Sequence, residues 1–61
     1  MKIETKIKRV VNSLVENNNF SVEEAEAAVS DTMEYFDLAE LSIPYFLNAL
    51  LITYNVEGVE R

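Results

Sequence analysis

Helix-breaking residues are almost missing from this chain, which has one glycine and one proline in 61 residues. β-Sandwiches and β-barrels need many tight turns, and glycine and proline are the residues that favour such turns. The sequence therefore argues against both folds and favours helices joined by few loops. Apolar residues make up 49% of the chain, too many for a disordered segment. We expect an all-α fold in a single domain.

The chain also lacks the usual covalent and metal supports of a small protein. It contains no cysteine and no histidine, so a disulfide is excluded and a structural zinc site is not expected. A hydrophobic core of this size supplies only about 3–5 kcal/mol of stability. Close helix packing or association with another chain must therefore stabilise the fold, and we expect a homo-oligomer, most simply a homodimer.

Residues 2–17 are predicted to form the first helix. Apolar side chains recur there at spacings of three and four residues, which places them on one helix face. They are Ile3, Ile7, Val10, Val11, Leu14 and Val15. Three consecutive asparagines at 17–19 favour a helix end, because asparagine tolerates the left-handed backbone conformation.

The second helix, predicted over residues 22–37, has the clearest local signal in the sequence. Ser21 and Glu24 have the spacing of a capping box, in which each side chain accepts a hydrogen bond from the other residue's amide. Phe20, just before the cap, is expected to pack near Ala25. The predicted apolar face consists of Val22, Ala25, Val29, Met33 and Phe36.

A third helix is predicted over residues 43–54, with Pro44 in its first turn, where the missing amide hydrogen costs little. Ser42 or Ile43 would be its N-cap. Residues 55–61 are expected to form a frayed tail. We therefore interpret residues 1–61 as one compact three-helix domain.

The third helix differs from an ordinary surface helix because it is apolar on two faces instead of one. One face consists of Ile43, Phe46, Leu47, Leu50, Leu51 and Tyr54. The opposite face consists of Tyr45, Asn48, Ala49 and Ile52. One explanation is that the 37–41 connection or the tail covers this second face. The explanation that we favour is that the second face is a dimer or partner interface. Twelve residues are too few to span a membrane.

The charges are unevenly distributed along the chain, whose net charge is −6. Four of the five basic residues lie within the first nine positions, and seven acidic residues lie between positions 23 and 40. The predicted acidic face consists of Glu23, Glu26, Glu34 and Asp37. If helices one and two are antiparallel, Lys2, Lys6 and Arg9 can pair with acids near the end of helix two. Alternatively, the acidic face receives a basic protein, such as one that binds nucleic acid.

Direct contact with nucleic acid is not expected, even though helices two and three superficially suggest a helix-turn-helix. The would-be recognition helix, 43–54, contains no lysine, arginine or glutamine and does not suit major-groove recognition. The acidic net charge also disfavours contact with phosphate or with an anionic membrane surface.

Recognisable catalytic patterns are lacking, so we predict no catalytic, cofactor-binding or metal-ligating residues and no enzyme activity. The chain has no histidine or cysteine, its serines have no base at a recognised spacing, and one glycine cannot form a phosphate-binding loop. The acids match neither a calcium loop nor a di-metal Glu-x-x-His motif.

The sequence thus predicts a small acidic, non-enzymatic regulator or inhibitor that binds a protein through its acidic helix-two face and apolar helix-three face. The alternative is an assembly subunit whose third helix drives oligomerisation. Without an apolar signal segment or cysteine, the expected location is the cytoplasm. Short acidic chains without cysteine are also typical of proteins that phages and mobile elements encode.

Overall fold

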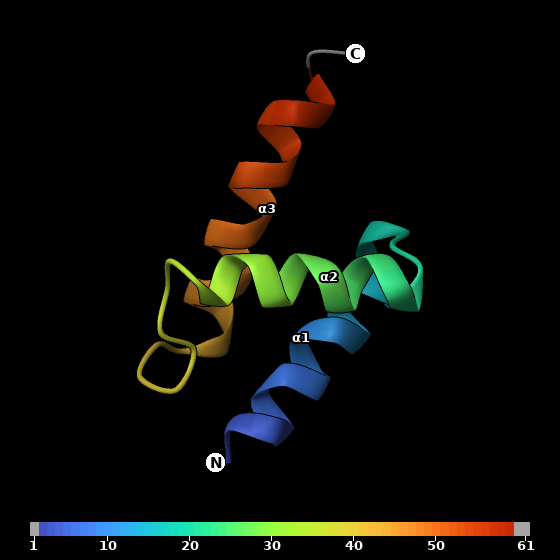
Figure 1. Cartoon of the computed structure of the whole chain (residues 1–61). Coiled ribbons are helices and arrows are strands. Elements are labelled where there is room, and N and C mark those ends of the chain that lie inside the picture. The colour runs from blue at the N-terminus through green and yellow to red at the C-terminus, as the bar shows by residue number, and fades with distance from the viewer. Residues whose placement is uncertain (1, 60–61) are drawn as a thin grey trace.

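The computed structural model describes residues 2–59, with side chains described as far as Tyr54. It consists of three helices, α1 (Ile3–Asn18), α2 (Val22–Met33) and α3 (Ile43–Val59), and the described residues include no strand. Figure 1 shows α2 crossing the other two helices, with the start of α1 and the end of α3 at opposite ends of the molecule. The predicted compact three-helix, all-α fold is confirmed.

α1 ends where the asparagines predicted. Asn19 has a φ of 62°, in the left-handed region, and the amide of Phe20 donates to the Leu14 carbonyl at 3.2 Å. The amide of Asn19 donates to the same carbonyl, so both bonds satisfy an acceptor that the helix end would otherwise leave open. The helix runs from residue 3 to residue 18, one residue later at each end than predicted.

The predicted capping box starts α2. The Ser21 hydroxyl accepts from the Glu24 amide at 3.0 Å, and the Glu24 carboxylate accepts from the Ser21 amide at 3.0 Å. Phe20 packs edge-on against the ring of Tyr54 on α3, with ring centroids 6.1 Å apart. The residue before the cap therefore joins the start of α2 to the third helix.

α2 ends at Met33, four residues before the predicted end at residue 37. The amides of Tyr35 and Phe36 both donate to the carbonyl of Thr32, which tightens the last turn. Had the helix continued, Leu38 would lie on its solvent face beside Glu34, because residues four apart share a face. Leaving the helix instead places Leu38 in the core, where it is almost fully buried.

Lys6 of α1 holds the connection between α2 and α3 in place. Its ammonium donates to the carbonyls of Leu38 (3.0 Å), Ala39 (3.3 Å) and Leu41 (2.8 Å). We expected Lys6 to pair with a carboxylate near the end of helix two. It instead satisfies three backbone acceptors, because the early end of α2 brings their carbonyls to the start of α1.

α3 begins after Ser42, whose hydroxyl accepts from the Tyr45 amide at 3.3 Å. The helix continues to Val59, so backbone that we expected to belong to a frayed tail is helical as far as that residue. Asparagine and glycine lower helix propensity by about 1 kcal/mol or less, whereas only proline breaks a helix outright. Residues 60–61 of the predicted tail lie outside the described residues.

All three helices and the connection before α3 contribute to one core. Ala25 and Ala28 on α2 are fully buried, and their small side chains allow the other helices to approach closely. Thr32 is also buried, and its hydroxyl donates to the Ala28 carbonyl at 2.8 Å. The buried apolar residues are Val10, Val11, Leu14, Ala25, Ala28, Val29, Leu38, Phe46 and Leu50.

Candidate protein-binding surfaces

The face of α3 opposite the core is open to solvent. We call Tyr45, Asn48, Ala49 and Ile52 the outer stripe. Tyr45 is 59% exposed and Ile52 is 56% exposed, although Phe46 and Leu50 on the other face are fully buried. Asn48 is exposed as well, and Ala49 is partly exposed. Tyr45 and Ile52 are seven residues apart, so they lie on the same side of the helix, two turns from each other.

Neither the 37–41 connection nor the described part of the tail, residues 55–59, lies over the outer stripe. The 37–41 connection directs Leu38 into the core and is bound to α1 through Lys6. Residues 55–59 continue α3 along its own axis, so their backbone extends beyond Tyr54 and does not fold back. The alternative was that helix three is central and mostly covered, but the described residues leave Tyr45 and Ile52 more than half exposed.

The predicted acidic face is less regular than a single helix face. Glu23, Glu26, Glu34 and Asp37 are all exposed, but only the first two lie within α2, because that helix ends at Met33. Glu34 is the C-cap residue and keeps a helical backbone, which leaves it near Glu23 in angle around the axis. Asp37 lies in the following turn, where its carboxylate accepts from the Ala39 amide at 3.0 Å.

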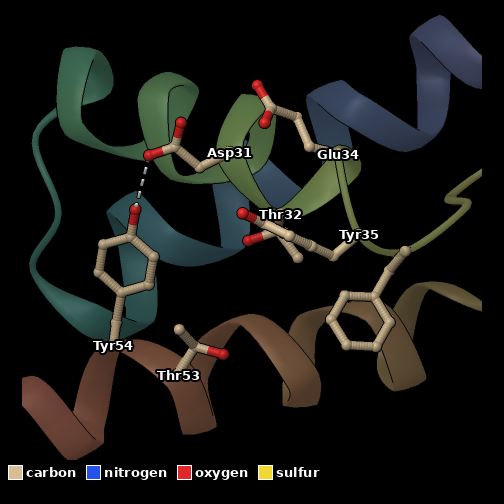
Figure 2. Close-up of a pocket in the computed structure, with 7 residues that line it drawn as sticks. Asp31, Thr32, Glu34, Tyr35, Thr53 and Tyr54 are labelled. Atoms are coloured by element: carbon tan, nitrogen blue, oxygen red, sulfur yellow. Dashed lines mark hydrogen bonds between the residues drawn. The ribbon is translucent and has the colours of Figure 1, made fainter.

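A groove lies between the end of α2 and α3, beside the acidic face. It has a volume of about 360 Å³, and Figure 2 shows the side chains around it. The Tyr54 hydroxyl donates across the groove to the Asp31 carboxylate at 3.4 Å. The lining residues are Asp31, Thr32, Glu34, Tyr35, Phe36, Thr53 and Tyr54. We call this site the α2–α3 groove.

This groove was not predicted from the sequence. We placed Tyr54 on the core face of helix three and assigned no role to Tyr35, which is 82% exposed. A signal for Tyr35 was available, because it is a large aromatic residue outside the predicted apolar face of helix two. No comparable signal existed for the groove itself, which depends on the early end of α2 and on the crossing of α2 and α3.

Two further, more apolar depressions lie side by side between α1 and α2, and Ile7 and Glu26 line both of them. Met33 lines one, and Val22 and Val11 line the other. Val22 and Met33, which we placed on the apolar face of helix two, are 55% and 37% exposed. Val22 and Met33 are exposed because the core side of α2 is centred on Ala25, Ala28 and Thr32, and both lie at its flank.

Among the described residues, no three histidine, cysteine, aspartate or glutamate side chains come together in a way that could hold a metal ion. In the described part of the chain, no helix has the length and apolar character required to cross a membrane. Comparison of the chain with protein-family models, curated proteins and solved structures finds no match.

Proposed function

We propose that this chain is a small, acidic, non-enzymatic regulator or inhibitor that works by binding another protein. The observation that carries the proposal is the outer stripe of α3. Tyr45 and Ile52 are more than half exposed on a helix whose other face already supplies the core. Full burial of a large apolar side chain contributes about 1.5–3 kcal/mol, so a partner that covers both gains a substantial share of a binding energy. Tyrosine is also enriched at the centres of interfaces.

The acidic residues of α2 support a basic partner, such as a protein that itself binds nucleic acid. Glu23, Glu26 and Glu34 are exposed, and the chain carries a net charge of −6. Such a charge distribution accelerates encounter with a positive surface and disfavours wrong partners. The acidic face and the outer stripe each point away from the core on different helices. A partner that contacts both must therefore extend over both helices.

A second candidate function, an assembly subunit, is favoured by the spacing within the outer stripe. Positions 45, 48, 49 and 52 follow the three-and-four spacing by which two helices pack side by side. Ala49, near the middle, would let a second copy of α3 approach closely. In this candidate the outer stripe forms a homodimer interface, and the acidic residues provide solubility only.

Binding of host proteins to the purified chain tests the main proposal and separates it from the alternative. The variants are Ile52→Asp in the outer stripe and the triple charge reversal E23K/E26K/E34K, with Arg9→Gln on α1 as an exposed control that belongs to neither surface. We expect a specific protein that wild type and the control retain, and that each of the two other variants loses. Because exposed charges are screened by salt, retention should also fall sharply as salt is raised.

Two results would contradict the proposal. If the triple charge reversal retains the same protein with the same salt dependence, the acidic face has no part in recognition. If Ile52→Asp also retains it, the outer stripe has none, and the regulator interpretation fails. Loss of a dimer in Ile52→Asp, with no protein other than the chain itself retained by wild type, would establish the assembly subunit instead.

A further inference from the structure

We infer that the α2–α3 groove binds an arginine side chain presented by the basic partner. This inference rests on the proposed function and specifies the partner group that the site accepts. Residues of α2, of the turn that follows it and of α3 line the groove, and one of them, Glu34, belongs to the acidic face. Its volume of about 360 Å³ is enough for one long side chain with its bound water.

The carboxylates of the groove have unused capacity for hydrogen bonds. The Asp31 carboxylate accepts one bond among the described residues, from the Tyr54 hydroxyl, and its length of 3.4 Å makes it weak. An ionised carboxylate offers about four acceptor positions, so it can still take both parallel N–H groups of a guanidinium. Glu34 adds a second negative charge at the rim, and Figure 2 shows its carboxylate directed away from α3.

The aromatic lining favours arginine over lysine. Tyr35, Phe36 and Tyr54 all line the groove, and Tyr35 is 82% exposed, so its ring is accessible to a partner. A guanidinium is flat and weakly hydrated, so it stacks on aromatic rings while it binds a carboxylate at its edge. An ammonium is compact and strongly hydrated and forms no such fork. The groove thus combines the two features that recognise arginine.

No basic residue of the described chain neutralises this groove. The described basic residues are confined to residues 2–9, none of them lines the groove, and the Lys6 ammonium is occupied by three loop carbonyls. A cation that fills the site therefore comes either from a partner or from Arg61, which lies outside the described residues. The Arg61→Gln variant below distinguishes the two sources. Charge complementarity therefore points to an external basic side chain.

A nuclear magnetic resonance titration of the ¹⁵N-labelled full chain tests the inference. The probe is the tripeptide acetyl-Gly-Arg-Gly-amide, with the Lys and Gln analogues in parallel. We expect saturable amide shifts centred on residues 31–36 and 53–54, and at least about fivefold weaker binding of the Lys analogue. Asp31→Asn should weaken arginine binding about tenfold, which is the scale of a lost charge-assisted pair. Glu26→Gln, the same charge change on the other flank of α2, should alter it less than about twofold.

Tyr35→Ala provides a second variant with little risk to the fold, since the residue is exposed, and it should weaken arginine binding at least about threefold. Equal effects of Asp31→Asn and Glu26→Gln, or shifts spread over every acidic residue, would overturn the inference and leave only general acidity. Two further results would overturn the inference. Groove shifts that depend on protein concentration without peptide would indicate binding of a second copy of the chain. Groove shifts caused by Arg61→Gln without peptide would indicate that Arg61 occupies the groove.

The two proposals fail in distinguishable ways. If Asp31→Asn retains the natural partner while Ile52→Asp loses it, the proposed function stands and the groove is not its arginine site. If the arginine peptide binds the groove as expected but neither variant changes retention of any protein, the groove is an arginine site and the proposed function is wrong.

Discussion

α1 and α3 are helices of similar length in the same small domain, yet they divide apolar side chains differently. α1 keeps them on the side that faces the core, where Val10 and Leu14 are fully buried, and its opposite side is polar. α3 buries Phe46 and Leu50 just as completely, and in addition presents Tyr45 and Ile52 to solvent. Folding explains the apolar content of α1 entirely. It explains only the inner face of α3, and the outer stripe requires another cause, which we propose to be association.

The contrast between the two faces of α3 can be tested first at Phe46. We expect Phe46→Ala to lower the free energy of unfolding by about 3–5 kcal/mol, because it removes the largest fully buried side chain and leaves a cavity. A core of this size supplies about that much in total, so the variant should be unfolded at room temperature. Circular dichroism during urea titration would measure this. A cooperative transition near that of wild type would show that the inner face is not the core.

A smaller effect is expected where α1 contributes to the fold through a polar side chain. Lys6→Met should lower the free energy of unfolding by about 1.5–3 kcal/mol, because three loop carbonyls lose a charged donor. Lys8→Met, an exposed control on the same helix with the same change of charge, should have little effect. Urea denaturation of both variants compares them directly. Equal destabilisation would mean that net charge matters and the Lys6 contacts do not.

The start of α2 should show the next smaller effect. Ser21→Ala removes the acceptor for the Glu24 amide and should cost about 1 kcal/mol, as is typical for loss of an N-cap. Ser30→Ala, at an exposed position within the same helix, should change stability little and is the matched control. Thermal unfolding followed by circular dichroism would compare the two. The prediction fails if the Ser30 variant is the less stable one.

The smallest effect on the isolated fold is expected in the outer stripe. Tyr45→Ser should change the free energy of unfolding of the monomer by less than about 0.5 kcal/mol, because the side chain is largely exposed in the single chain. Measurements at protein concentrations low enough to exclude association are required. A loss of several kcal/mol under those conditions would mean that Tyr45 belongs to the core, and the distinction between the two faces of α3 would disappear.

Features that depend on neighbouring residues were predictable from sequence, and features that depend on distant contacts were not. The capping box at Ser21, the end of α1 at the asparagines and the two apolar faces of α3 follow from local spacing. The end of α2 did not, because burial of Leu38 outweighed the helical pattern that continues to residue 37. The Lys6 contacts and the α2–α3 groove both depend on the early end of α2, so neither could be predicted from residue spacing alone.

The mass of the particle in solution shows whether the outer stripe of α3 mediates association. We predict that sedimentation equilibrium at micromolar concentration gives a mass above that of one chain for wild type, alone or with its partner. Ile52→Asp should give a folded single chain. A single-chain mass for wild type, together with unchanged partner binding by Ile52→Asp, would contradict the account.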